Sequence, residues 1–336
     1  MRPPAFWDTE AGRSSGAFTR ALLSPLGAVY AAMTARRIAH TTPTPAPAPV
    51  ICVGNLTVGG TGKTPVTLAL LNAAREVGRT PAALSRGHGG TLKGAVRVDA
   101  QIHHAGQVGD EPLLLARNAP AYIDANRVDG ARLAVSDGAD LIVMDDGHQN
   151  PKLEKTLSLV VVDGVTGWGA GKVLPAGPLR EPVKAGLARA DAIVVMVPTP
   201  ADEIDYNRLQ LTELDIPVLK AWLEPAAPPP EGPLLAFAGI GRPQKFFDSL
   251  KAQGGELADA VSYPDHHRFT RSEIDQLADL ARAHGATLIT TEKDWVRLPG
   301  DIQTHVTAWP VQACFELPAR LTGLIEEAVD RFDKQG

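Results

Sequence analysis

A glycine-rich stretch, residues 54–65, contains the residue types that bind phosphate groups. It reads Gly-Asn-Leu-Thr-Val-Gly-Gly-Thr-Gly-Lys-Thr-Pro, follows the apolar run 50–53 and leads into apolar residues at helical spacing. A strand, a glycine-rich loop and a helix in this order are typical of a phosphate-binding loop, in which backbone amides converge on phosphate oxygens. Lys63 is then expected beside the β- and γ-phosphates, and the hydroxyl of Thr64 is expected to bind Mg²⁺.

The loop departs from the usual pattern at one position, because Thr57 stands where a glycine is common. Gly59 and Gly60 are expected to supply the backbone freedom instead. The alternative interpretation, a glycine turn with a surface lysine, does not account for the flanking strand and helix. The residues predicted to contact ATP are Asn55, Thr57, Val58, Gly59, Gly60, Thr61, Gly62, Lys63, Thr64 and Pro65.

A second apolar run, residues 139–144, ends in Asp145 and Asp146. When a strand lies beside a phosphate-binding loop, a carboxylate at its C-terminal end can bind the magnesium ion or its waters. The two aspartates therefore complement the loop and predict a site for a nucleotide together with Mg²⁺.

Charged residues also follow other predicted strands. Arg86 comes after the predicted strand 81–85, where it can contact a phosphate or cap a turn. Arg180 and Glu181 lie in the Pro- and Gly-rich loop 174–182, between two further buried runs. Ligands of open α/β sheets bind at the carboxyl ends of the strands, so both residues are candidates for the site. The alternative is a plain surface ion pair.

Two other places have residues able to transfer a proton. Asp110 and Glu111 precede an apolar helix, and on local grounds they are better explained as first-turn charges that suit the helix dipole. His266 follows Asp265 and precedes His267. A zinc site is disfavoured there, because neighbouring side chains point apart and no third ligand has suitable spacing. Proton transfer by an Asp-oriented histidine is more attractive, and a loop histidine without a role is the competing interpretation.

Composition excludes several classes of protein. With 44% hydrophobic and 21% charged residues, the 336-residue chain is typical of a soluble globular protein of two domains. A formal net charge of −5 gives no electrostatic reason to expect nucleic acid as a partner. The two cysteines, Cys52 and Cys314, lie in separate apolar runs, so a disulfide framework is unsupported and a reducing compartment fits.

The order of the elements predicts an α/β fold of the P-loop NTPase type. It should contain a mostly parallel sheet with helices on both faces, plus a smaller second α/β domain. Residues 1–40 are basic and amphipathic, which fits either a helix packed on the domain or an element lying on a membrane surface. We expect the following division: the segment 1–40, a Pro-rich spacer 41–49, a P-loop kinase domain 50–223, a Pro-rich linker 224–233, and a C-terminal domain 234–336.

The nucleotide is predicted to be ATP. Guanine recognition normally requires Asn-Lys-x-Asp, and residues 291–294 read Thr-Glu-Lys-Asp, with the lysine one position late and no asparagine. A kinase also needs a base for the acceptor hydroxyl. The residues alone do not rank the candidates for that base, which are Asp110, Glu111, Asp145, Asp146 and His266.

Several of these motifs together resemble one family. In order along the chain they are residues 54–65, 85–87, 109–112, 145–149, 179–182, 264–266 and 291–294. In this order they resemble the tetraacyldisaccharide 4′-kinases, or lipid A 4′-kinases, whose loop variant Gly-Gly-Thr-Gly-Lys-Thr-Pro also accounts for Thr57. The resemblance covers nearly the whole chain, from the basic N-terminal segment to the last predicted strand.

The resemblance implies transfer of the γ-phosphate of ATP to the 4′-hydroxyl of a tetraacylated glucosamine disaccharide 1-phosphate. It implies that Lys63 and Thr64 handle ATP and Mg²⁺, and that Asp145 supports the metal with Asp146 close by. It makes Asp110 the base, assisted by His266, against the local interpretation of Asp110. The remaining site residues that it implies, with Arg86 as the phosphate candidate named above, are Glu111, Arg127, Arg180 and Glu181.

The same resemblance favours membrane contact for residues 1–40, because the acyl chains of such a substrate stay in the bilayer. We therefore expect a peripheral protein on the cytoplasmic face of the inner membrane, with an anionic membrane surface as partner and no protein partner. Two other functions compete with the kinase. One is a P-loop ATPase that acts as a switch or metallochaperone, and the other is a nucleotide-binding adaptor at the membrane surface. No role is predicted for His148 or His267.

Overall fold

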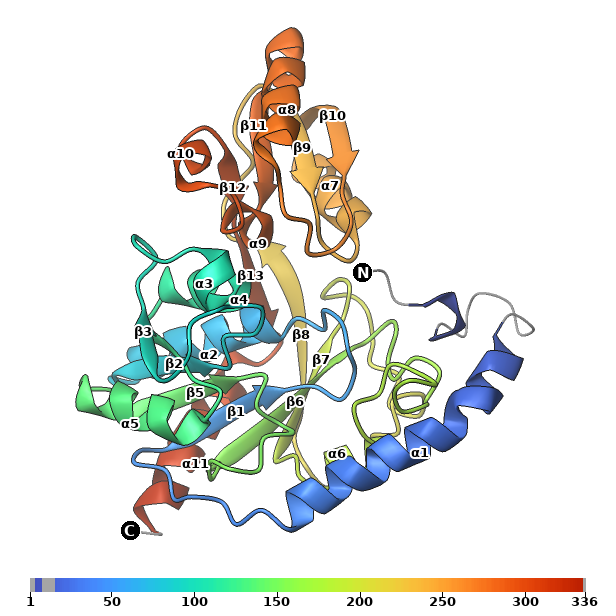
Figure 1. The fold of residues 1–336 in the computed structure, drawn as a ribbon, viewed down its shortest axis with the longest axis vertical. Helices are drawn as coiled ribbons and strands as arrows, with labels where there is room; N and C mark the ends of the chain where they lie inside the picture. Colours follow the sequence, from blue (N-terminus) through green and yellow to red (C-terminus); the bar gives the residue numbers. More distant parts are fainter. Residues whose placement is uncertain (1–3, 8–15, 335–336) are drawn as a thin grey trace.

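The larger of two sheets forms the centre of the molecule (Figure 1). The structure is a computed structural model that describes residues 4–7 and 16–334. Within them the sheet has nine strands in the order β13-β8-β7-β6-β1-β5-β2-β4-β3, parallel except for β3 and β13 at its two edges. The strands are β1 (Val50–Gly54), β2 (Pro81–Ser85), β3 (Val96–Val98), β4 (Ala121–Ile123), β5 (Leu141–Asp145), β6 (Leu157–Asp163), β7 (Ala192–Met196), β8 (Val218–Pro225) and β13 (Val311–Phe315).

The central strands are apolar on both faces, and helices cover both faces. On β1, Ile51 and Val53 belong to one hydrophobic core, while Val50 and Cys52 belong to another. Successive strand residues point to opposite faces, so a continuous apolar run needs cover on each side. The first face packs against α2 (Lys63–Glu76), α4 (Asp110–Ala116) and α11 (Pro318–Asp333), and the opposite face against α5 (Arg127–Ser136) and α6 (Val183–Leu187). The predicted fold class is confirmed.

A smaller parallel sheet, in the order β10-β9-β11-β12, lies beyond the edge of the larger sheet (Figure 1). Thr270 caps the longest helix of this domain and accepts a hydrogen bond from the backbone of Glu273, as part of a capping box. The elements are β9 (Pro233–Ala238), α7 (Pro243–Ala252), β10 (Glu256–Ser262), α8 (Arg271–His284), β11 (Thr287–Thr291), α9 (Glu292–Trp295), α10 (Gly300–Gln303) and β12 (Thr307–Trp309).

The expected C-terminal domain, 234–336, is wrong at its C-terminal end. After β12 the chain returns to the larger sheet, where β13 pairs with β8 and α11 packs against α2. The apolar face of α11, with Leu321 and Ile325, is part of the same core as β1. Helical periodicity shows that α11 buries one face, but it does not show against which sheet. The two domains are therefore joined by two chain crossings, after β8 and before β13.

The position of α11 leads to a stability prediction. Ile325 is fully buried in the core of the larger sheet, so Ile325→Ala should lower the free energy of unfolding by about 2–5 kcal/mol. Glu326→Ala, at the exposed neighbouring position, should change it by less than about 0.5 kcal/mol. Urea unfolding, followed by circular dichroism, measures both. Equal effects of the two substitutions would contradict the assignment of α11 to this core.

The N-terminal part of the chain contains α1 (Ala17–Ala39) after a short 3-10 helix, η1 (Ala5–Trp7). Residues 1–3 and 8–15 of the expected segment 1–40 lie outside the described residues. Helix α1 lies along the outside of the molecule beside α6 (Figure 1). Among the described helices, none is both long enough and apolar enough to cross a membrane.

Candidate active site

The phosphate-binding loop connects β1 to α2, as predicted from its sequence. Gly59 and Gly62 have φ angles of 120° and 89°, a left-handed region that glycine adopts without the Cβ penalty of other residues. Helix α2 begins at Lys63, so its free backbone amides point into the loop. Inside the loop, the side-chain amide of Asn55 donates a hydrogen bond to Oγ1 of Thr61 at 3.2 Å. The loop is therefore braced from within.

Thr57, at the position where glycine is usual, has a structural explanation. It forms an isolated antiparallel bridge with Leu179, and the amide of Val58 donates to the carbonyl of Pro178 at 2.8 Å. The first half of the loop is thus extended and attached to residues 178–180, the turn that contains Arg180. A side chain is tolerated there because Thr57 has an extended partner, whereas the tight turn is at Gly59–Gly62.

Asp145 ends β5 and is fully buried beside the loop. Oγ1 of Thr67 donates to its Oδ1 at 3.2 Å, while Oδ2 has no hydrogen-bond partner within the described part of the chain. Burial, followed by the charge of Glu111, raises the pKa of Asp145 to about 7. A buried carboxylate oxygen without a partner is costly, and a cation would satisfy it. Glu111, predicted for the same site, is therefore close enough to act on Asp145 electrostatically.

The carboxylate of Asp146 contacts both Lys63, at the end of the phosphate-binding loop, and Arg180, in the loop 174–182. It accepts two hydrogen bonds from Arg180, at 2.8 and 2.9 Å, and lies 3.8 Å from Nζ of Lys63. Burial alone would raise its pKa, but the charges of Lys63 and Arg180 outweigh burial and hold the pKa of Asp146 below its usual value. Lys63 is therefore already placed at the end of β5, with its charge balanced before any nucleotide binds.

Arg127 adds positive charge near the same aspartates, and the charge of Arg86 acts on Arg127. Arg127 begins α5 and is 3% exposed; its Nη1 donates to the carbonyl of Asp124 at 2.9 Å. Its Nε has no partner within the described residues. Burial, followed by the charge of Arg86, lowers the pKa of Arg127 to about 10. Two arginines this close, one with an unpaired donor, suit a bound anion.

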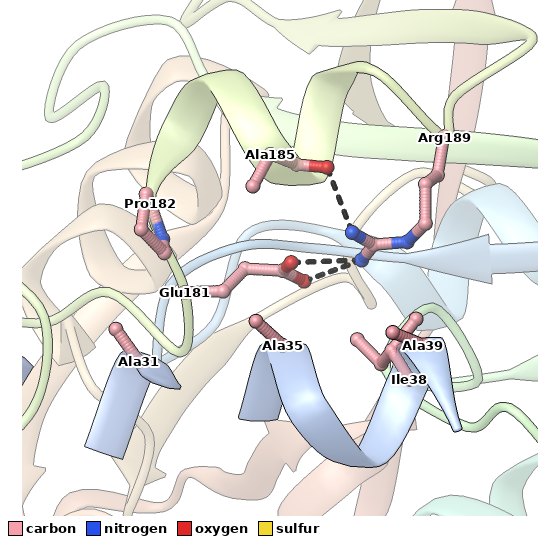
Figure 2. A pocket seen from close by; sticks show the side chains of 8 residues that line it. All are labelled: Ala31, Ala35, Ile38, Ala39, Glu181, Pro182, Ala185 and Arg189. Atoms are coloured by element: carbon pink, nitrogen blue, oxygen red, sulfur yellow. Dashed lines mark hydrogen bonds and ion pairs between the residues drawn. The ribbon is translucent and has the colours of Figure 1, made fainter. Parts of the chain in front are cut away.

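Glu181 supports the loop. Figure 2 shows its carboxylate against Arg189, which donates to it at 2.7 and 2.8 Å beside a cavity of about 160 Å³ between α1 and α6. Its Oε1 also accepts from Gln149 at 2.9 Å, and Gln149 donates to the carbonyl of Asn55. Glu181 is 3% exposed. Its connection to the phosphate-binding loop is indirect and runs through the side chain of Gln149.

Asp110 and His266 are 156 residues apart in sequence and meet at the boundary between the two domains. Oδ2 of Asp110 lies 3.2 Å from Nδ1 of His266. Burial raises the pKa of Asp110, but the hydrogen bond from His266 and the charge of Arg297 reverse that effect and hold the pKa well below its usual range. Asp110 is in the first turn of α4, so the helix-dipole interpretation and the contact with His266 both hold.

The two unassigned histidines are structural. His148 packs against Gly54 and its Nε2 is 2.9 Å from the carbonyl of Gly186, while burial lowers its pKa to about 4. His267 lies 3.0 Å from Glu273 and stacks on Tyr263 with ring centroids 4.7 Å apart. His148 therefore packs against the start of the glycine-rich loop, whereas His267 is held within the smaller domain.

Some residues of the site were not predicted from sequence. Most of them reach it through contacts with residues distant in sequence. Thr67, one helical turn after Lys63 on α2, has a local signal in the helical spacing, and Gln149 and Lys293 lie within the motif ranges 145–149 and 291–294. The residues missed are Thr67, Gln149, Arg189, Lys293 and Arg297.

Known proteins that are similar to this chain over nearly its full length belong to the family that its motifs resemble. The model of the family described as tetraacyldisaccharide-1-P 4′-kinase matches residues 19–330. The tetraacyldisaccharide 4′-kinase of Maricaulis maris is 57% identical over 331 residues, which cover 98% of this chain and 97% of that protein. The protein of the same name from Hyphomonas neptunium is 49% identical over 337 residues, covering 99% and 100%.

A solved structure agrees with these matches. The crystal structure described as the "apo" form of LpxK from Aquifex aeolicus in complex with ATP aligns with a TM-score of 0.73 and 27% sequence identity. The alignment covers 93% of this chain and 99% of that one. A full-length family match, relatives of about half identity or more and a shared fold agree. This chain belongs to the tetraacyldisaccharide 4′-kinase family.

Proposed function

We propose that this protein transfers the γ-phosphate of ATP to the 4′-hydroxyl of a tetraacylated glucosamine disaccharide 1-phosphate. The product is the bisphosphorylated lipid A precursor, and the family membership of the chain gives the substrate class. One observation carries the chemistry. The contact between Asp110 and His266 lies at a domain boundary and joins α4, which packs on α2, to the smaller domain. The helix that follows the phosphate-binding loop and the helix that carries the candidate base, Asp110, therefore pack in the same hydrophobic core.

The chain's own residues account for most of what phosphoryl transfer requires. The reaction asks mainly for positioning and charge neutralisation, because charge develops on the transferred group and the leaving oxygen. Lys63 and the amides at the start of α2 neutralise phosphate oxygens, and Arg180 shares with Lys63 the negative charge of Asp146. Asp110, with His266, accepts a hydrogen bond from the acceptor hydroxyl and takes its proton as the bond from the hydroxyl oxygen to the γ-phosphorus forms and the bond from that phosphorus to the bridging oxygen of ADP breaks.

Magnesium fits the donors that the site offers. Within residues 4–7 and 16–334, no three His, Cys, Asp or Glu side chains form a complete metal site. Mg²⁺, however, is usually bound through one or two carboxylates together with substrate phosphates and water. The unpartnered Oδ2 of Asp145 and the hydroxyl of Thr64 would hold the ion, which supplies charge neutralisation for the β- and γ-phosphates.

An assay with labelled nucleotide tests the proposal. Purified protein is incubated with ATP labelled in the γ-phosphate and the tetraacyl disaccharide 1-phosphate in mixed micelles, and the lipid and aqueous fractions are counted separately. Label in the lipid, lost when ATP is replaced by GTP, is the expected result. Label only in free phosphate would instead favour an ATPase, and label in neither fraction would favour a nucleotide-binding adaptor.

The proposal includes peripheral binding to an anionic membrane surface, on the cytoplasmic face of the inner membrane. Large apolar side chains on α1 are unusually exposed, with Phe18 at 80% and Met33 at 67%. Arg36 and Arg37 occupy the last turn of the helix. A helix with an exposed apolar face and basic residues is suited to lie in the interface of a bilayer. The apolar side chains exposed along α1 are Phe18, Leu22, Leu26, Val29, Tyr30 and Met33.

This surface leads to a prediction. The double variant Leu22→Glu/Leu26→Glu should weaken binding to anionic vesicles by about 10²–10⁴-fold, because each buried leucine contributes about 1.5–3 kcal/mol. Ile102→Glu is the matched control, since Ile102 is 72% exposed but lies in the loop before α3 (Ala105–Val108). Vesicle sedimentation measures both. Unchanged binding of the double variant would rule out α1 as the membrane-binding element.

A further inference from the structure

Arg297 is a buried arginine that connects the two domains at the proposed site. It follows α9, and its side chain is 6% exposed. Its Nη1 donates to Oδ1 of Asp294 at 2.8 Å and to the carbonyl of Gly239 at 3.1 Å, both in the smaller domain. Its Nε donates to Oδ2 of Asp110, in the larger domain, at 2.9 Å, and Nη2 contacts the same oxygen. The planar guanidinium group presents its donors at fixed angles, so these contacts fix the direction of the carboxylate.

His266 is attached to the same peptide group as Arg297. Its backbone amide donates to the carbonyl of Gly239 at 3.0 Å, and the amide of Gly239 donates to Oδ2 of Asp294 at 2.9 Å. His266 has a φ of 58°, which for a residue other than glycine costs about 1–3 kcal/mol and persists only when its surroundings hold it. Arg297 and His266 are therefore held as one rigid unit in contact with Asp110.

The charges around Asp110 come from both domains. Facing it are Arg297 and the ring of His266, with Nζ of Lys293 3.4 Å from Nε2 of that ring. The carboxylate of Asp265 lies 4.0 Å from the same Nε2, so His266 is between acidic and basic groups. The donors from Arg297 and His266 converge on Oδ2 of Asp110, which leaves Oδ1 outside this group of contacts.

A second ion pair across the domain boundary provides a comparison. Arg242, at the start of α7, contacts Asp163 at the end of β6. The side chain of Arg242 is 52% exposed, and within the described part of the chain it forms its ion pair with Asp163, away from Asp110 and His266. Both pairs hold the domains together, but only Arg297 contacts the predicted base. Substitutions of the two arginines therefore distinguish the effect of weakening the contact between the domains from the effect of misaligning the predicted base.

We propose that Arg297 is a positioning residue for phosphoryl transfer, which keeps the carboxylate of Asp110 charged and directed at His266 when the domains meet. This inference rests on the proposed kinase function. It assigns to Arg297 no contact with ATP or lipid; its effect passes through Asp110. The Thr-Glu-Lys-Asp stretch then has a structural role, because Asp294 holds both Arg297 and the backbone that supports His266.

The test begins with Arg297→Met, measured by transfer of label to lipid at several pH values. We expect kcat to fall by about 10²-fold, the scale on which a small misplacement of a reacting group acts. KM for ATP should stay within about threefold. Removing the cation weakens the charged form of Asp110 and raises the pKa of its carboxyl, so the acidic limb of the kcat profile should move to higher pH. Arg242→Met should leave that limb in place.

A double-variant cycle keeps the test decisive if Arg297→Met does not fold, since Oδ1 of the buried Asp294 would lose its hydrogen bond from Arg297. Arg297→Lys keeps the positive charge but not the planar guanidinium group with its several donors. It should lower kcat less than Arg297→Met. In an Asp110→Asn background, Arg297→Lys should have almost no further effect, because its action passes through Asp110. A full additional loss in that background, or an equal shift of the acidic limb by Arg242→Met, overturns the proposal. Absence of labelled lipid with the unsubstituted protein is a different result, which contradicts the proposed function itself.

Discussion

Lys63→Ala is expected to lower the turnover of phosphoryl transfer by about 10²–10³-fold, the cost of removing one preorganised charge-stabilising donor. Lys63 is 8% exposed at the first position of α2, so its ammonium group is already desolvated and directed at the end of β5. Its charge is balanced by Asp146 at 3.8 Å, and the substitution leaves that carboxylate with Arg180 alone. Affinity for ATP should fall as well, because the lysine contacts phosphates in the ground state.

Turnover at saturating ATP and the dissociation constant of ATP, measured by calorimetry, check this result. Lys184→Ala is the control, since Lys184 is an exposed lysine on α6 near the same rim of the sheet and should leave both quantities unchanged. Thermal unfolding shows whether the loop variant keeps its fold. Turnover of Lys63→Ala within threefold of the unsubstituted protein would remove Lys63 from the chemistry.

Asp110→Asn is expected to lower turnover by about 10²–10⁴-fold, the usual contribution of a general base. The asparagine keeps the size of the side chain and can still accept hydrogen bonds from Arg297, so the substitution removes charge and basicity with little change in packing. ATP affinity should stay nearly unchanged, because Asp110 lies outside the phosphate-binding loop. Single-turnover measurements with labelled ATP separate the chemical step from binding.

The control for Asp110 addresses the helix-dipole interpretation directly. Asp129 is also an acidic residue in the first turn of a helix, α5, but it pairs with Arg132 on the surface. Asp129→Asn should cost about 0.3–1 kcal/mol of stability at most and leave turnover unchanged. If the two aspartate variants behaved alike, Asp110 would be a first-turn charge and no more.

Together, the contacts describe how the two domains share one site. The larger domain supplies the loop, the two aspartates of β5 and Asp110, while the smaller domain supplies His266 and Arg297. Among the residues that the structure describes, Asp110 is the carboxylate that both His266 and Arg297 contact. Because the proposed base, Asp110, depends on contacts from the smaller domain, we expect substitutions at the boundary to affect turnover more than ATP affinity.

Most of the elements could be predicted because their signals are local. The strands β1, β5, β6 and β7 are continuous apolar runs, and α8 begins at a capping box. The loop was recognisable for the same reason, since glycines between a strand and a helix specify backbone geometry within a few residues. The expected site at the carboxyl ends of the strands follows from the rule that parallel strands place those ends together.

The part of the core against which a segment packs is not determined by its local sequence. The apolar face of α11 predicts burial, yet burial against α2 and β1 is decided by the return of the chain through β13. The role of Glu181 could not be read from its neighbours either. Its partner Arg189 is eight residues away, and the contact with Gln149 depends on how two loops meet. Arg297 belongs to no motif, because its function lies in a contact 187 residues away in the chain.

The sequence by itself determined that this chain has a P-loop, a mostly parallel sheet with helices on both faces and the residue types for an ATP-dependent kinase. Those features depend on residue order over short distances, where spacing dictates backbone geometry. Only the tertiary structure decided that Asp110 meets His266, that Arg297 joins them, and that the last strand and helix complete the first domain. These contacts depend on how distant segments pack, and that is set by the whole core.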